Sequence, residues 1–185
     1  MDYWHSVRGL TADDLIFIDE SGVNLALTRL YARSLKGARA YGSRPQNKGK
    51  NVSLISALSL KGLLSNVSIM GSVNGLTFEA FVASRLVPLL WPGACVILDN
   101  CPIHKPRFIG ELIESVGAKL IYLPPYSPDF SPIENCFSKV KAILRKLGAR
   151  TYSELKVAID TAFDAISSDD IRGWFTHCCY CSSDD

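Results

Sequence analysis

Three acidic residues in this chain are of the right type, and at suitable positions in the sequence, to act together on a phosphodiester: Asp19, Asp99 and Glu134. Carboxylate oxygens are hard ligands, which suit Mg²⁺ or Mn²⁺ and do not suit zinc. Three carboxylates cannot lie close together and all stay ionised unless cations neutralise them, so without metal we expect them to be partly apart. Two ions about 4 Å apart would neutralise them and would also clamp the attacking and leaving oxygens of a phosphodiester. We therefore expect these residues to be both catalytic residues and ligands of a two-ion Mg²⁺ or Mn²⁺ site.

Each of these carboxylates also has a simpler interpretation. Asp19 and Asp99 could be ordinary turn residues, because each ends an apolar run. Glu134 could complete a capping box with Ser131, which needs no chemistry. These interpretations become weaker if folding brings all three side chains to one edge of a sheet. The elements that carry the carboxylates therefore decide between the two.

Three short apolar segments predict buried strands of one sheet. They are residues 15–19, 94–99 and 119–123, with the sequences LIFID, ACVILD and KLIYL. The first two end in Asp19 and Asp99, and residues 20–22 predict a turn after the first. Ligands of an open α/β sheet collect at the carboxyl ends of its parallel strands, so we expect both aspartates at that edge.

A proline-rich turn precedes Glu134. Residues 124–132 contain four prolines, so neither a helix nor a central strand can form there. Ser131 is of the N-cap type and Pro132 suits the first helical position, which places Glu134 in the first turn of a helix. An apolar stripe at helical spacing supports this helix, formed by Ile133, Phe137, Val140, Leu144 and Leu147.

Turn and helix signals organise the rest of the chain. Residues 51–60 and 63–70 are β-rich and are joined by a Lys-Gly pair, which predicts a hairpin. Thr151 and Glu154 form a second capping box, which begins another helix. Further helices are predicted over residues 77–90 and 106–116. An early antiparallel part followed by alternating helices and strands indicates an α/β fold, with a mixed sheet and helices on both faces.

Size and composition are those of one globular domain. The chain has 185 residues, 48% of them hydrophobic and 21% charged, and its longest apolar runs are too short to span a bilayer. The N-terminus lacks the form of a signal peptide, so we expect a cell interior, where the six cysteines stay reduced. The expected organisation is a leader or linker remnant (1–14), a catalytic domain (15–168) and a C-terminal tail (169–185).

The basic residues are unevenly distributed along the chain. The net charge is only +2, but no acidic residue lies between Glu20 and Glu79, a span that holds eight basic ones. A solvated basic surface would explain this run, but such a long segment of one sign favours contact with a polyanion such as DNA. The candidate DNA contacts are Arg44, Lys48 and Lys50 in this span, together with Lys141 and Arg145 on the same flank of the helix as Glu134.

Three segments around the carboxylates resemble a known family. FIDESG at residues 17–22, LDNCPIH at 98–104 and YLPPYSPDFSPIEN at 122–135 are similar to the signature blocks of mariner-type insertion-sequence transposases. The positions that match the Asp–Asp–Glu (DDE) triad of that family are Asp19, Asp99 and Glu134, and the 34 residues between the last two are typical of one large branch. The resemblance covers most of the chain and implies a ribonuclease-H-like, retroviral-integrase-like fold with a mixed five-stranded sheet.

The resemblance implies cut-and-paste DNA transposition. Two-metal hydrolysis of phosphodiesters at the transposon ends would be followed by transfer of the freed 3′-hydroxyl into target DNA, usually at a TA dinucleotide. Asp19 would bridge two Mg²⁺ or Mn²⁺ ions, and Asp99 and Glu134 would each complete one. The implied partners are transposon-end and target DNA and a second copy of the chain in the active complex. Full-length relatives begin with helix-turn-helix modules, which an upstream segment or a frameshift fusion would supply here.

The expected location is therefore the bacterial cytoplasm, at the nucleoid, or the nucleus of a eukaryote. Two other functions stay open: an inactive transposase-derived protein that binds DNA or assembles complexes, and another ribonuclease-H-like two-metal nuclease. The intact triad opposes the first of these, and the proline-rich block opposes the second.

Several other residues near the triad have weaker signals. Asn100 and Asn135 could orient the carboxylates or could equally be turn residues. His104 could touch the scissile phosphate or a metal-bound water, or could simply cap the next helix. Tyr126 and Phe130 could contact DNA, but we expect them to pack under the proline-rich loop. A dense cluster near the C-terminus lacks a separated second ligand pair, so we expect a buried tail there rather than a zinc site. Its members are His177, Cys178, Cys179 and Cys181.

Overall fold

The computed structural model describes residues 3–101 and 107–181. Within these residues a five-stranded sheet has the strand order β3-β2-β1-β4-β5. The strands are β1 (Leu15–Val23), β2 (Val52–Ser59), β3 (Gly62–Met70), β4 (Cys95–Leu98) and β5 (Lys119–Tyr122). β2 pairs antiparallel with both β1 and β3, whereas β4 lies parallel between β1 and β5. The predicted hairpin and mixed five-stranded sheet are confirmed.

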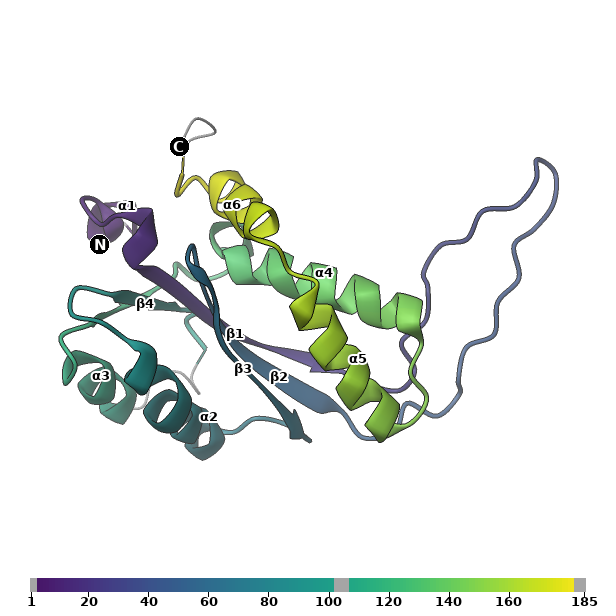
Figure 1. The fold of residues 1–185 in the computed structure, drawn as a ribbon, viewed down its shortest axis with the longest axis horizontal. Coiled ribbons are helices and arrows are strands. Elements are labelled where there is room, and N and C mark those ends of the chain that lie inside the picture. Colours follow the sequence, from purple (N-terminus) through teal and green to yellow (C-terminus); the bar gives the residue numbers. More distant parts are fainter. Residues whose placement is uncertain (1–2, 102–106, 182–185) are drawn as a thin grey trace.

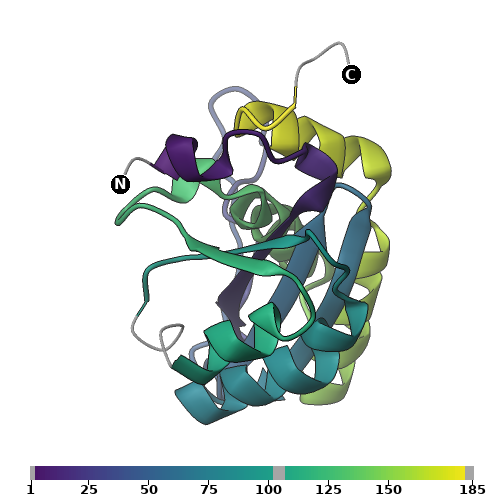
Figure 2. The ribbon, with the colours of Figure 1, turned by 90° about the vertical axis from the view of Figure 1, so that its left-hand side faces the viewer.

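Helices cover both faces of this sheet, as Figures 1 and 2 show. One layer contains α1 (Tyr3–Val7), α4 (Pro132–Leu147), α5 (Tyr152–Asp164) and α6 (Ser168–His177). The other contains α2 (Gly75–Phe81), the π-helical turn η2 (Val82–Leu86), the 3₁₀ turn η3 (Val87–Leu89) and α3 (Arg107–Glu114). The short 3₁₀ turns η1 (Ala12–Asp14) and η5 (Pro128–Phe130) lie in connections. The helix predicted over 77–90 therefore changes type along its length, and it ends around Pro88, which lacks an N–H for α-helical bonding.

Alternate residues of the central strand point to the two helical layers. Phe17 packs with the cluster that includes α4, α5 and α6, whereas Ile16 and Ile18 pack with the cluster of α2, η2 and α3. This alternation is the two-residue period of a strand buried on both faces. It places Asp19, which has the same parity as Phe17, on the α4 side of the sheet.

The turn predicted over residues 20–22 is wrong. β1 continues through these residues to Val23 because they pair with β2, with Glu20 opposite Ile55 and Gly22 opposite Ser53. Serine and glycine favour turns locally, but the antiparallel ladder satisfies their backbone groups and overrides that preference.

Residues 24–51 connect β1 to β2 as a long irregular arm, which extends away from the sheet in Figure 1. We call this segment the basic arm, because all of its cations are exposed: Arg29, Arg33, Lys36, Arg39, Arg44, Lys48 and Lys50. The two sides of the arm meet at its base, where Leu25 N donates to Lys48 O at 3.1 Å. There Arg150 Nη1 donates to the carbonyls of Leu25 and Leu27, and Tyr152 Oη accepts from Lys50 N. The connection between α4 and α5 and the first residue of α5 thus fix the base of the arm.

Both ends of the chain pack against the same end of the sheet (Figures 1 and 2). Tyr3 and Val7 of α1 and Ile171 and Phe175 of α6 are buried in the same hydrophobic cluster as Phe17. The predicted capping box of Thr151 and Glu154 is present at the start of α5. Among the described residues, no helix combines the length and the apolar character needed to cross a bilayer.

Candidate active site

Asp19 lies where β1 loses one of its two neighbouring strands. The parallel pairing of β1 with β4 ends at Ile18 opposite Leu98, but β1 goes on beside β2, with Asp19 opposite Ser56. The backbone N–H of Glu20 donates to Asp19 Oδ1 at 2.7 Å and holds that oxygen. Asp19 is therefore in mid-strand, yet it is at the carboxyl edge of the parallel part of the sheet.

Asp99 directly follows β4 at the same edge. Because Ile18 and Leu98 are paired, the next residues of the two strands, Asp19 and Asp99, lie side by side. The backbone N–H of Cys101 donates to Asp99 Oδ1 at 2.9 Å, in the manner of an aspartate that stabilises its own turn. One oxygen of each aspartate thus accepts a backbone hydrogen bond.

Glu134 reaches this edge from the first turn of α4. η5 and a buried Ser131 lead into the helix, and Pro132 occupies its first position. The Ser131 side chain makes no capping hydrogen bond with the described backbone, so the capping box considered for Ser131 and Glu134 is not formed. Ile133 and Phe137 are buried against the sheet, and Glu134 between them is exposed. Its carboxylate is therefore available for another role.

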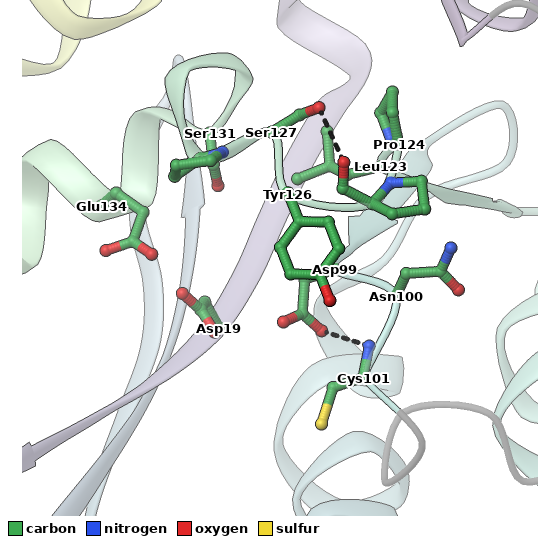
Figure 3. Close-up of a pocket in the computed structure, with 12 residues that line it drawn as sticks. Asp19, Asp99, Asn100, Cys101, Leu123, Pro124, Tyr126, Ser127, Ser131 and Glu134 are labelled. Atoms are coloured by element: carbon green, nitrogen blue, oxygen red, sulfur yellow. Dashed lines mark hydrogen bonds between the residues drawn. The ribbon is translucent and has the colours of Figure 1, made fainter.

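The three carboxylates line one cavity of about 570 Å³. In Figure 3 the carboxylates of Asp19 and Glu134 point toward one another, and that of Asp99 enters the same space from the other side. Asn100, Cys101 and the proline-rich turn complete the walls. Folding thus brings together side chains that are more than a hundred residues apart in the sequence.

The electrostatics of this cavity disfavour negative charge on Asp19. Burial raises the pKa of Asp19 from its ordinary value of 3.8 to about 7, and the charges of Glu134 and Asp99 add to the rise. The hydrogen bond from the Glu20 N–H opposes it. A cation placed between the carboxylates would remove this repulsion and favour the ionised form.

A family model described as DDE superfamily endonuclease matches residues 14–156, which is most of the chain and includes all three carboxylates. The chain belongs to the DDE superfamily of endonucleases. A search of curated proteins found no match.

Solved structures of the Mos1 transposase resemble this endonuclease in fold. For the Mos1 mariner paired-end complex with Mn, the TM-score is 0.78 and the identity 18%, over 95% of this chain and 56% of that chain. For the catalytic domain of Mos1 mariner transposase alone, the TM-score is 0.65 and the identity 16%, over 91% of this chain and 79% of that chain. The endonuclease thus spans little more than half the length of the Mos1 chain in the complex. The likeness confirms the predicted fold class.

The three carboxylates are ligands of the type that Mg²⁺ and Mn²⁺ prefer. Among the described residues, no three His, Cys, Asp or Glu side chains are arranged so that they could hold a metal ion together as they stand. Mutual repulsion predicts such an open arrangement in the absence of metal. The donors are all oxygens at one cavity, and burial together with the charges of Glu134 and Asp99 raises the pKa of Asp19, an effect that a bound cation would oppose.

The other residues named from the sequence lie in different places. Asn100 lines the cavity, whereas Asn135 points away from it and brings its Nδ2 within 3.9 Å of Cys178 Sγ. His104 lies outside the described residues. Cys178 is buried and Cys179 is exposed, and the described residues of the C-terminal cluster form no metal site.

The candidate DNA contacts lie outside the cavity wall. Arg44, Lys48 and Lys50 are exposed on the basic arm. Lys141 and Arg145 are half-buried on α4, about 10 and 16 Å along the helix from Glu134 at a rise of 1.5 Å per residue. A DNA backbone that leaves the cavity along α4 would therefore pass both of these cations.

Two features of the site escaped the sequence analysis. Tyr126 was expected to pack under the proline-rich loop, but it is fully exposed at the cavity with a backbone φ of 58°. The left-handed backbone turns its side chain outward, and the two prolines before it gave no sign of that conformation. Ser56, opposite Asp19, has a buried Oγ with no hydrogen-bond partner among the described residues. A lone strand serine has no sequence signal that would mark it.

Proposed function

We propose that this chain is the catalytic domain of a cut-and-paste DNA transposase of the mariner type. It would hydrolyse phosphodiesters at the ends of its transposon and transfer the freed 3′-hydroxyl into target DNA, at TA sites. The observation that carries the proposal is the convergence of Asp19, Asp99 and Glu134 on one cavity, at one edge of a sheet with the Mos1 fold. A DDE endonuclease with an assembled set of carboxylates has the parts that this reaction needs.

The ligands of the metal ions would be Asp19, Asp99 and Glu134, with two Mg²⁺ or Mn²⁺ ions per site. Bound ions supply charge stabilisation for the attacking and leaving oxygens of the phosphodiester. Because the pKa of Asp19 is raised to about 7, its carboxyl is only partly ionised near neutral pH without metal, and a proton that it holds must leave before it can act as a ligand. The backbone N–H groups of Glu20 and Cys101 donate to Asp19 Oδ1 and Asp99 Oδ1 and so help to fix both side chains at the cavity. Asn100, at the cavity wall, would orient the carboxylates or the substrate.

DNA would approach along positively charged parts of the surface. The basic arm carries seven exposed cations, and its base is fixed to the start of α5, which follows the C-terminal end of α4. Arg44, Lys48 and Lys50 on the arm and Lys141 and Arg145 on α4 would contact phosphates. These contacts would hold the duplex without reading its sequence.

Sequence recognition and pairing of the transposon ends would need further parts. The solved Mos1 structures that resemble this chain also include a paired-end complex with the left transposon end and a strand transfer complex. By analogy we propose that two copies of this chain act together on two ends. A helix-turn-helix module, encoded upstream or joined by frameshifting, would read the inverted repeats. The protein would act where its DNA is, at the bacterial nucleoid or in a nucleus.

A nicking assay tests the proposed reaction. The protein is incubated with Mg²⁺ or Mn²⁺ and a supercoiled plasmid that carries the DNA flanking its gene on both sides, where the inverted repeats of a transposon would lie. We expect metal-dependent nicking and strand transfer that Asp99→Ala abolishes. The matched control is Asp129→Ala, which removes an exposed carboxylate of η5 that does not line the cavity and should keep activity.

Two results would count against the proposal. Full nicking by Asp99→Ala would show that the triad does no chemistry. DNA binding without nicking by the wild type, even after fusion to a module that binds the repeats, would instead favour an inactive transposase-derived protein.

A further inference from the structure

A tyrosine outside the family-matched region bonds directly to the turn that leads into α4 and Glu134. Tyr180 follows α6, beyond residues 14–156, and its hydroxyl donates to the carbonyl of Phe130 at 2.7 Å. The same hydroxyl bonds to the hydroxyl of Tyr3 at 2.5 Å. Because the Tyr180 proton is donated to Phe130, Tyr3 is the donor of the second bond. The two ends of the chain thus form a relay that terminates on the last residue of η5.

Ring contacts support the same connection. The Phe130 ring stacks on Tyr3 with centroids 6.0 Å apart and planes 7° apart, and it meets Trp4 edge-on at 5.2 Å. The Tyr180 ring packs against Trp4 at 5.6 Å. We call these four residues, Tyr3, Trp4, Phe130 and Tyr180, the aromatic clasp. Stacked and edge-on rings at these centroid distances are the arrangements that aromatic pairs favour.

Tyr180 also touches the strand that carries Asp19. Its ring lies 5.0 Å from that of Phe17, two residues before Asp19 in β1. One side chain therefore contacts both β1 and η5, the elements that deliver two of the three carboxylates. A shift of Tyr180 would change the position of one carboxylate relative to the other.

The turn before Glu134 has few hydrogen bonds of its own. Its prolines lack N–H groups, and the described backbone bonds within it run from Phe130 N to Ser127 O and from Ser131 N to Pro128 O; Ser127 Oγ adds a long bond of 3.4 Å to Pro125 O. The Phe130 carbonyl is instead held from outside by Tyr180. Burial raises the pKa of Tyr180, and raises that of Tyr3 to about 12, so both hydroxyls keep their protons at neutral pH.

We propose that Tyr180 is a positioning residue of the active site, whose hydroxyl, oriented by Tyr3, fixes the Phe130 carbonyl and thereby the place of Glu134 relative to Asp19. This inference rests on the proposed function of the three carboxylates as metal ligands. It assigns a role in the site to the two ends of the chain, which lie on either side of the matched region.

Calorimetric titration with MnCl₂ tests this role without relying on activity. The full chain is compared as wild type, Glu134→Gln, Tyr180→Phe and the double variant. We expect Tyr180→Phe to weaken Mn²⁺ binding about tenfold, at the low end of the effect of groups that orient metal ligands. In the Glu134→Gln background the same change should have no further effect, because Tyr180 acts through Glu134. A merely structural defect would weaken binding in both backgrounds.

Tyr152→Phe is the matched control. It also removes a tyrosine hydroxyl that bonds to backbone, at Lys50, but far from η5 in the sequence, so its Mn²⁺ affinity should equal that of the wild type. Tyr3→Phe removes the bond between the two tyrosines and leaves the bond from the Tyr180 hydroxyl to the Phe130 carbonyl. It should therefore lower the Mn²⁺ affinity less than Tyr180→Phe does. If Tyr180→Phe does not fold, as judged by circular dichroism, Tyr3→Phe with and without Glu134→Gln decides the question.

The outcomes separate the two proposals. Equal Mn²⁺ binding by wild type and Glu134→Gln would refute the metal site, and the role of Tyr180 with it. Loss of binding in Glu134→Gln but wild-type binding in Tyr180→Phe would overturn the positioning role alone. Additive losses in the double variant would also overturn it.

Discussion

Replacing Asp19 by asparagine should stabilise the protein when no divalent cation is present. Burial and the charges of Glu134 and Asp99 raise the pKa of Asp19 from 3.8 to about 7. Each pKa unit is worth about 1.4 kcal/mol, so the ionised side chain destabilises the fold by at most about 4 kcal/mol. Because Asp19 is largely buried but lines a cavity that is open to solvent, we expect part of this maximum, about 1–3 kcal/mol, or roughly 2–12 °C in Tm for a chain of this size. Asparagine keeps the oxygen that accepts from the Glu20 N–H.

The gain in stability should depend on pH in a defined direction. Because the folded-state pKa of Asp19 lies above the unfolded value, the folded protein binds the proton more tightly between about pH 4 and 7. This contribution to wild-type stability is present at low pH and is lost as the pH rises through that window. The advantage of Asp19→Asn should therefore be at least twice as large at pH 8 as at pH 5.

Thermal and urea unfolding at these two pH values measure the effect. The control is Asp13→Asn, which removes an exposed aspartate of η1 and should change stability equally at both. Added Mg²⁺ or Mn²⁺ at pH 8 should stabilise the wild type more than Asp19→Asn, because a ligand that binds the folded state shifts the unfolding equilibrium. Equal gains at both pH values, or a loss of stability at pH 8, would show that burial and the neighbouring carboxylates do not raise the pKa of Asp19 in the folded protein.

Three further changes have defined outcomes. Replacing Arg44, Lys48 and Lys50 together by alanine should weaken plasmid binding in filter assays. The slope of the logarithm of the binding constant against the logarithm of the salt concentration should become shallower by up to about 3, since each phosphate contact contributes about 0.9. An unchanged slope would show that the arm does not contact DNA. Tyr152→Phe loses the bond to Lys50 N and should speed tryptic cleavage within the basic arm about fivefold, since a hydrogen bond contributes about 1 kcal/mol. An unchanged cleavage rate would mean that other contacts hold the base of the arm. Ser56→Ala should leave the free energy of unfolding unchanged or raise it by about 1 kcal/mol, because the Oγ it removes is buried without a described partner; a clear loss in urea denaturation would reveal a hydrogen bond.

Local patterns in the sequence were enough to predict the framework of the protein. The apolar run at Lys119–Tyr122, the hairpin and the capping box of Thr151 depend on neighbouring residues, and all three are present in the structure. The Asp-ended runs and the proline block identified Asp19, Asp99 and Glu134 as one set. The parallel register of β1 and β4 explains why the first two meet, since strands that pair at Ile18 and Leu98 must place their next residues side by side.

Contacts between distant residues decided what no local pattern contains. Pairing with β2 continued β1 past Asp19, where serine and glycine suggested a turn. A left-handed backbone exposed Tyr126, and packing beside α6 turned Asn135 toward Cys178. The bond between Tyr3 and Tyr180 joins residues 177 positions apart, so nothing in either neighbourhood predicts it. The sequence by itself therefore determined which groups are available for chemistry. The distances between these groups, and the burial and neighbouring charge that set their protonation, exist only once the sheet and α4 have packed together.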